Sequence, residues 1–197
     1  MTEWTQRAHV LADHAVSGVL GHVSSLHFDT MSELLWVGSA SGQLTSHTGA
    51  LPTLPRYTSL AAHGVPKQPR HVRGILSDDK FIISLSEGRV CASQRQGLGR
   101  WSMQIEDHAP GVALAGLCAS PQSASSDIIV GGAAPNSHDA LFALHSISGR
   151  VVRSAVSDGT VTQLRKGSRY LCVGTEQGTI QLHDPRSLRA EHKLPAH

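Results

Sequence analysis

A ten-residue pattern near the start of the chain returns near its end. The first copy runs from Leu35 to Leu44 and the second from Leu171 to Ile180. Each copy contains an apolar stretch, a glycine, a hydroxyl residue, two turn residues, a second glycine and the start of another strand. Self-similarity over this distance predicts a fold that is built from one repeated unit.

Two further units lie between these copies, so that apolar strand signals recur four times. The equivalent small residues are about 43 to 47 positions apart and are Gly38, Ser84, Gly131 and Gly174. This period, with short strands and glycine-rich turns, is typical of WD40-type β-propeller blades. Helical periodicity is nearly absent, so we predict an all-β chain. The fourth unit has His183 where a WD repeat carries tryptophan, which makes the repeat degenerate.

The predicted blades lie near residues 23–60, 70–105, 112–150 and 158–197, after an amino-terminal segment, residues 1–22, that could supply a closing strand. Gly21-His22 and Ala196-His197 both occupy the Gly-His phase of a WD repeat, so a fifth blade would begin at the end of the sequence. Propellers close with about four to eight blades, and four blades of this length predict an incomplete, open ring. We therefore expect a fragment of a longer propeller, the alternative being a complete small protein.

Composition narrows the classes of function. Hydrophobic residues make up 40% of the 197, enough for a buried core. Charged residues make up 16% and the net charge is +2, which argues against non-specific binding of phosphate backbones. The cysteines, Cys91, Cys118 and Cys172, fit neither a disulfide framework nor a zinc site. Without a long apolar run, the sequence predicts a soluble intracellular protein.

Several strings in the chain are more specific than a generic WD motif. They are Phe28-Asp29-Thr30 with Glu33-Leu34-Leu35-Trp36-Val37-Gly38, Arg56-Tyr57-Thr58, and Arg169 to Gly174 with Asp184 to Leu188. With these strings the sequence resembles the amino-terminal WD40 region of the catalytic subunit of the poly(A)-nuclease deadenylation complex. The resemblance covers residues 23–197, with residues 120–138 poorly matched.

The resemblance implies a non-catalytic scaffold that acts in cytoplasmic poly(A)-tail shortening and mRNA decay, including in P-bodies. In the family, a linker that binds a pseudokinase regulatory subunit, an inactive ubiquitin-hydrolase-like domain and a DEDD-type exonuclease follow the propeller. No position here matches the nuclease motif, so we expect no cofactor; Mg²⁺ is expected only for that nuclease domain. Expected partners are the pseudokinase and, indirectly, the poly(A) ribonucleoprotein, with no membrane and no small-molecule substrate.

Two alternatives remain at this point. One is an unrelated WD40 adaptor for protein–protein interaction, and the other is an enzyme with a site at the propeller axis. The second would need acid, base or metal-binding residues that converge on one rim, and the sequence offers none.

The residues that could form metal or acid–base sites are assigned structural roles. Thirteen histidines include local pairs, but none has ligand spacing, and His22 is interpreted as a repeat histidine. The local pairs are His9 with His14, His22 with His27, and His63 with His71. Asp78-Asp79 and Glu106-Asp107 are expected in a turn and a loop, not in general acid–base or two-metal chemistry.

The glycine-rich strings and the basic clusters are also assigned structural roles. The string from Gly38 to Gly42 resembles a nucleophile elbow, but Ala40 stands at the nucleophile position. Gly97-Leu98-Gly99 lacks the strand and helix of a phosphate-binding loop. The basic clusters, residues 67–73 and Arg186 with Arg189 and Lys193, are predicted to be solvated loops, with contact to RNA or protein as the alternative. We therefore predict no catalytic, metal-binding or cofactor-binding residue.

Overall fold

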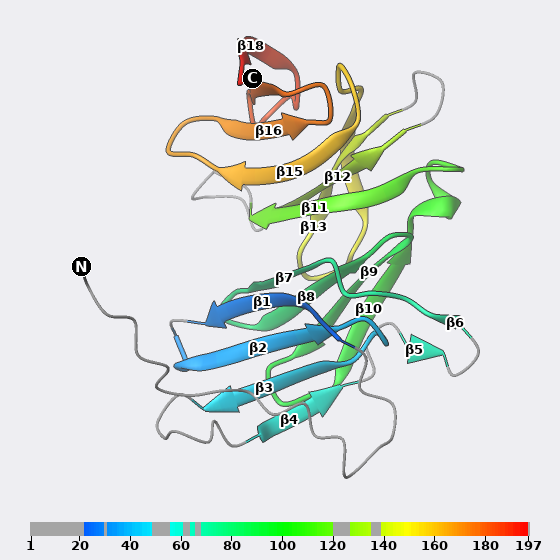
Figure 1. The fold of residues 1–197 in the computed structure, drawn as a ribbon, viewed down its shortest axis with the longest axis vertical. Coiled ribbons are helices and arrows are strands. Elements are labelled where there is room, and N and C mark those ends of the chain that lie inside the picture. The colour runs from blue at the N-terminus through cyan, green and yellow to red at the C-terminus, as the bar shows by residue number, and fades with distance from the viewer. Residues whose placement is uncertain are drawn as a thin grey trace.

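Four antiparallel sheets of four strands each form most of the described chain (Figure 1). This computed structural model describes residues 22–29, 31–48, 56–60, 64–65, 68–119, 127–134 and 139–196. Blade one contains β1 (Val23–Asp29), β2 (Leu34–Ser39), β3 (Leu44–Thr48) and β4 (Arg56–Leu60). Blade two contains β7 (Gly74–Ser77), β8 (Phe81–Ser86), β9 (Arg89–Gln94) and β10 (Gly99–Gln104). Blade three contains β11 (Ala113–Ala119), β12 (Asp127–Ala133), β13 (Leu141–His145) and β14 (Val151–Ala155). Blade four contains β15 (Val161–Lys166), β16 (Leu171–Thr175), β17 (Thr179–His183) and β18 (Ala190–Pro195).

Two small elements connect the blades. A two-stranded ribbon, β5 (Gly64–Val65) with β6 (Gln68–Pro69), precedes blade two, and the 3₁₀ helix η1 (Ile105–Asp107) precedes blade three. Strand order within every blade follows the order in the sequence, so each blade is an up-and-down meander.

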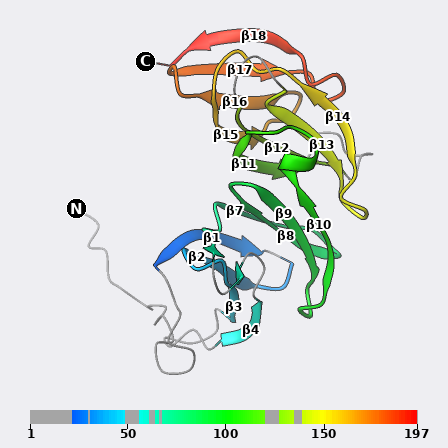
Figure 2. The same cartoon turned by 90° about the vertical axis from the view of Figure 1, so that its right-hand side faces the viewer.

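The first strands of consecutive blades lie side by side. β1 contacts β7, β7 contacts β11, and β11 contacts β15. Figures 1 and 2 show blade one at the bottom, blades two and three in the middle and blade four at the top. Because β1 and β15 lie at opposite ends of this series, the blades form an open arc. The all-β propeller with four blades and an open ring, as predicted, is therefore confirmed. The predicted closing strand in residues 1–22 lies outside the described residues, apart from His22.

The repeated glycines mark a bulge in three of the four blades. The pairing of the first two strands shifts register where Gly38, Gly131 and Gly174 face the first strand. Glycine within a strand often marks a bulge. A Cβ at residue 38 would lie 2.6 Å from Val72 Cγ1, whereas a Cβ at residue 174 would have ordinary contacts only. Blade two has Ser84 at the equivalent position, and β7 pairs with β8 without a shift. The sequence period therefore corresponds to one structural feature of the blade.

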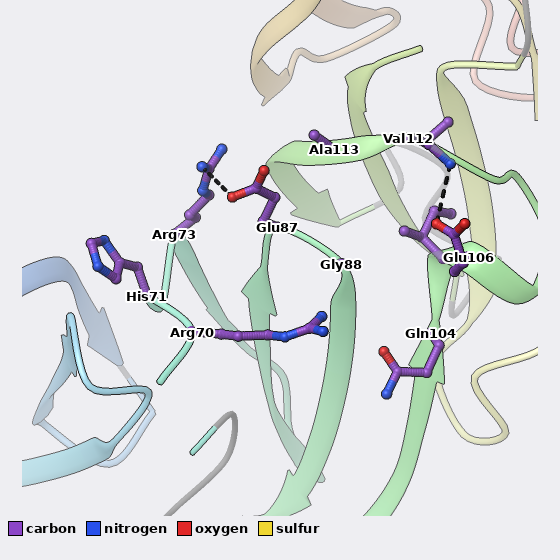
Figure 3. Close-up of a pocket in the computed structure, with 11 residues that line it drawn as sticks. Arg70, His71, Arg73, Glu87, Gly88, Gln104, Glu106, Val112 and Ala113 are labelled. Carbon is purple, nitrogen blue, oxygen red and sulfur yellow. Dashed lines mark hydrogen bonds and ion pairs between the residues drawn. The ribbon is translucent and has the colours of Figure 1, made fainter. Parts of the chain in front are cut away.

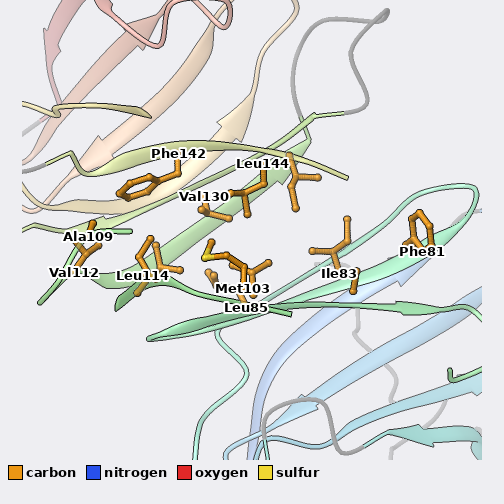
Figure 4. Packing of buried hydrophobic residues seen from close by; sticks show 14 residues of the cluster. Phe81, Ile83, Leu85, Met103, Ala109, Val112, Leu114, Val130, Phe142 and Leu144 are labelled. Atoms are coloured by element: carbon orange, nitrogen blue, oxygen red, sulfur yellow. The ribbon is translucent and has the colours of Figure 1, made fainter. Parts of the chain in front are cut away.

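Apolar side chains fill the spaces between neighbouring blades. The largest cluster joins blades two and three, where Ile83 and Leu85 face Val130, Phe142 and Leu144 (Figure 4). A second cluster joins blades three and four through residues such as Ile129, Leu141 and Leu164. Each such side chain contributes roughly 1.5–3 kcal/mol when it is fully buried. The core is therefore a series of layers between blades.

A smaller, more polar layer joins blades one and two. Trp36 is fully buried against Ile82, while a buried ion pair lies close by. Arg95 donates hydrogen bonds to both carboxylate oxygens of Asp29 and, through Nε at 3.0 Å, to the carbonyl of Asp78. Since the Asp29 carboxylate is fully buried, this guanidinium supplies the charge that the interior requires.

Candidate functional site

The structure describes three of the six histidines that form the local pairs. His9, His14 and His63 lie outside the described residues. His27 is half-buried, with Nε2 2.8 Å from Ser77 Oγ and 3.2 Å from the Ser77 backbone nitrogen, which donates to it. Burial lowers the pKa of His27, and the nearby Asp29 carboxylate opposes this shift. Across the described ranges, no three His, Cys, Asp or Glu side chains are grouped for a metal ion.

The acidic pairs take part in local hydrogen bonding. Asp78 turns the chain from β7 into β8, because its Oδ1 accepts from the backbone nitrogen of Lys80 at 2.7 Å and of Phe81 at 2.6 Å. Glu106-Asp107 lies in η1, where a plain loop was predicted. This turn forms because the backbone nitrogens of His108 and Ala109 both donate to the carbonyl of Ile105.

The glycine-rich strings are strand-to-strand turns. Ser39 Oγ lies 2.8 Å from Ser41 Oγ and accepts from the backbone nitrogen of Gln43 at 3.0 Å. Gly42 has a φ of 84°, the left-handed region that favours glycine. Gly97 likewise turns β9 into β10, with a φ of 104°. These hydroxyls and glycines therefore shape turns.

Cys91, Cys118 and Cys172 do not form disulfides. Burial raises the pKa of Cys91 to about 11, and burial raises that of Cys118 to about 12. A thiol with such a pKa is protonated at neutral pH and is a poor nucleophile. In both strands these side chains act as small apolar residues of the blade.

The second basic cluster is divided between two environments. Lys193 on β18 forms an ion pair with Asp158, with Nζ 2.6 Å from Oδ2. Arg186 and Arg189 are exposed in the turn between β17 and β18, where Asp184 accepts from the backbone nitrogen of Arg186 at 3.1 Å. That hydrogen bond, with those from Ser187, lowers the pKa of Asp184. This cluster is a structured turn with an exposed rim.

The first basic cluster contributes to a cleft of about 710 Å³ (Figure 3). Arg70, His71 and Arg73 line one side, on the segment that leads into β7. The turn between β8 and β9, the end of β10 and the residues before β11 line the rest. Strand pairing explains this convergence: Gly74 faces Leu85, so the segment before β7 and the β8–β9 turn lie at the same end of blade two.

Backbone hydrogen bonds hold these loops together. The nitrogen of Ile105 donates to the carbonyl of Gly88 at 3.0 Å, and the nitrogen of Leu114 donates to the carbonyl of Glu87 at 2.6 Å. The second bond joins blade two to blade three. The cleft is therefore lined by a backbone that both blades fix in place, a typical setting for binding loops on a rigid scaffold.

The charged groups of the cleft differ in how they are compensated. Arg73 Nη2 lies 2.9 Å from Glu87 Oε2, and Glu106 Oε2 accepts from the backbone nitrogen of Gly111 at 3.1 Å. Arg70 has neither a hydrogen bond nor an ion pair within the described part of the chain. The sequence indicated Arg70 and Arg73, but no signal marked Glu87 or Gln104, which pairing of distant segments brings to the same cleft.

Comparison with known proteins decides the family. A family model described as PAN2 N-terminal matches residues 8–197. The chain belongs to this family. The PAN2-PAN3 deadenylation complex catalytic subunit pan2 of Aspergillus oryzae is 34% identical over 175 residues, which cover 88% of this chain and 14% of the relative. The subunit of the same name from Schizosaccharomyces pombe is 30% identical, over 89% of this chain and 15% of the relative.

Solved structures agree with the PAN2 family assignment. The Pan2 WD40 domain of Neurospora crassa superposes with a TM-score of 0.75 at 27% identity, over 89% of this chain and 50% of that domain. The WD40 propeller domain of Doa1 superposes at 0.67 with 13% identity, over 90% of this chain and 55% of that domain, and supports the fold alone. The predicted family is confirmed, and with it the WD40 class of the propeller. The chain spans about one-seventh of the length of the curated relatives.

No helix among the described residues is long and apolar enough to cross a membrane.

Proposed function

We propose that this chain is a non-catalytic scaffold of a PAN2-type deadenylase subunit and acts in the shortening of mRNA poly(A) tails. The observation that carries the proposal is the family match over residues 8–197 to the amino-terminal region of PAN2. The described residues of that region are blade strands and the turns between them. Loops from neighbouring blades converge on one rigid face, an arrangement that suits the binding of partners.

The partners in this proposal are proteins of the deadenylation machinery. The relatives are named as catalytic subunits of a PAN2-PAN3 complex, which supports a pseudokinase PAN3-type subunit as the regulatory partner. The poly(A) ribonucleoprotein is engaged indirectly, through those proteins. Neither a membrane nor a small-molecule substrate has a part in the proposal, which places the chain in the cytoplasm and in P-bodies.

A nuclease assay on the pure chain tests the non-catalytic part of the proposal. In the family, the Mg²⁺-dependent chemistry belongs to a nuclease domain, and no position of this chain matches the nuclease motif. We expect a poly(A) oligonucleotide to keep its length when it is incubated with the chain and Mg²⁺. Trimming of the 3′ end that follows the chain through successive purification steps would contradict the proposal.

A further inference from the structure

The cleft beside Arg70 contains one positive charge that the described residues do not compensate. Figure 3 shows the Arg70 side chain extended across the cleft toward Gly88 and Gln104, while Arg73 reaches the Glu87 carboxylate. A guanidinium has five N–H donors in a fixed fork and stays charged at any physiological pH. Arg70 therefore presents an unused bidentate donor to whatever enters the cleft.

Gly88 provides the space for this guanidinium. A Cβ at residue 88 would lie 2.7 Å from Arg70 Nη1 and 3.8 Å from its Cζ. Gly88 does not have a positive φ, unlike Gly42 and Gly97, so the β8–β9 turn itself does not require glycine. Arg70 therefore lies directly over the backbone of Gly88, and an added Cβ at that residue would make the end of the arginine side chain shift.

The remaining groups of the cleft select the kind of anion. The formal charges of Arg70, Arg73, Glu87 and Glu106 sum to zero. A polyanion that pairs with Arg70 would therefore also meet two carboxylates in the same cleft, Glu87 and Glu106. Among the described lining residues there is no Phe, Tyr or Trp, and His71 supplies the ring on which a base could stack. A single carboxylate matches the guanidinium fork, and the neutral residues on either side of it avoid Glu87 and Glu106.

We propose that this cleft binds an acidic side chain from an extended segment of a partner protein, with the guanidinium of Arg70 as the anchor. The volume of about 710 Å³ is in the range of sites that enclose a few residues. Gln104, exposed on the opposite wall, has an amide that can donate to the same carboxylate or to the peptide next to it. The inference rests on the proposed scaffold role, for which it names the chemistry of one partner.

The test uses end-blocked pentapeptides and the isotope-labelled chain. One peptide carries a single glutamate among alanines, and its counterpart carries glutamine. Nuclear magnetic resonance follows the backbone amide of Gly88 and the Nε–Hε group of Arg70 while the peptide is added in excess to dilute protein. We expect the glutamate peptide to shift both signals in a saturable way and the glutamine peptide to leave them unchanged.

Three variants locate the binding site. Arg70→Gln should weaken binding about tenfold or more, since it removes the charge with which the carboxylate pairs. Gly88→Ala keeps the charge but displaces the guanidinium, so it should weaken binding as well. Arg100→Gln, at an exposed arginine outside the cleft, is the matched control and should bind as the parent chain does. Urea unfolding of each variant confirms that the fold is retained.

Several results would overturn the inference. Equal binding of the glutamine peptide would show that the cleft does not recognise the carboxylate. Unchanged binding by Arg70→Gln would show that Arg70 is not the anchor. Shifts of the same two signals by oligo(A), but not by the glutamate peptide, would make RNA the occupant. If the parent chain supported tail shortening normally but did not bind the glutamate peptide, this inference alone would be rejected. If it bound the peptide but did not support tail shortening, the scaffold role alone would be rejected.

Discussion

The carboxylate of Asp29 is fully buried at the boundary between blades one and two, where the Arg95 guanidinium compensates its charge. The side chains of the pair Arg73–Glu87 are instead 40% and 61% exposed. Removing one partner from a buried pair leaves an uncompensated charge in the interior. When an exposed pair loses one partner, water solvates the charge that remains. The two ion pairs therefore differ in what they contribute to stability.

Asp29→Asn should lower the free energy of unfolding by about 3 kcal/mol, because Arg95 then keeps its charge without a counter-ion. Glu87→Gln should lower it by less than about 1 kcal/mol. Urea unfolding of the parent chain and both variants measures these changes. Equal effects of the two substitutions would show that burial does not set the strength of the inter-blade pair.

Buried titratable groups link stability to pH. Burial lowers the pKa of His27 and of His183, whose Nδ1 lies 2.8 Å from the carbonyl oxygen of Leu188. Burial by itself raises the pKa of Asp29, but the hydrogen bonds from Arg95 and from the Met31 backbone nitrogen outweigh this and hold that pKa below its usual value. Both effects favour the charge states that these groups have near neutral pH.

Stability should therefore fall as the pH is lowered. Below pH 6.5, the ordinary histidine pKa, the unfolded chain binds protons that His27 and His183 do not bind in the folded chain. Below pH 3.8, the ordinary aspartate pKa, the unfolded chain likewise binds a proton that Asp29 does not bind in the folded chain. Urea midpoints between about pH 7.5 and 4.5 measure the slope. His183→Gln should reduce that slope, and a slope that His183→Gln leaves unaltered would contradict this origin.

At the scale of the element, the blade is set by its bulge and its turns. Gly38 faces the bulge in β1, and the same turn returns in blade four, where Gly178 takes a φ of 71° as Gly42 does in blade one. A side chain at residue 38 would meet Val72, whose Cγ1 lies 2.6 Å from the position of an added Cβ. Gly99 at the start of β10 has nothing within 4 Å of that position.

Gly38→Ala should destabilise the fold by about 1–3 kcal/mol, since an added methyl overpacks the boundary between blades one and two. Gly99→Ala is the matched control and should change the free energy of unfolding by less than about 0.5 kcal/mol or raise it slightly. Thermal and urea unfolding provide both values. A tolerated alanine at residue 38 would mean that packing against Val72 does not require glycine there.

Most of the blade architecture could be predicted from the sequence, because short-range chemistry fixes it. Apolar runs such as Ile128 to Val130 form strands that are buried on both faces, and the repeated glycines occupy turns and bulge partners. The 3₁₀ turn at Glu106 could not be predicted, since it depends on the path from blade two to blade three. The cleft could not be predicted from the sequence either, because Arg70, Glu87 and Gln104 meet only where strand pairing brings three separate segments to one end of a sheet.

The whole molecule is an arc with two outer blade faces. On β1 of blade one, Leu26 is 62% and Phe28 57% exposed. On blade four, Leu194 of β18 is 48% exposed and faces Ile180 of β17, which is 38% exposed. Within the arc the equivalent faces are covered by the next blade. Exposed apolar faces of this kind promote association between molecules.

The isolated chain should therefore associate in a concentration-dependent manner. Phe28→Ser should shift the population toward monomer by removing part of the exposed face of β1, and Met31→Ser is the control, because Met31 is an exposed apolar residue in the following turn. Sedimentation velocity at several concentrations measures the distribution. A chain that stays monomeric at every concentration would contradict association through the exposed blade faces.

The rate at which a reconstituted PAN2-PAN3 complex shortens the tail of a poly(A) ribonucleoprotein tests the central claim most directly. The complex of Schizosaccharomyces pombe is suitable, since its pan2 is 30% identical to this chain. We predict that removing the matching region of that pan2 slows shortening, that this chain in its place restores the rate, and that the chain alone shortens nothing. An unchanged rate after removal, or shortening by the chain alone, would contradict a non-catalytic scaffold.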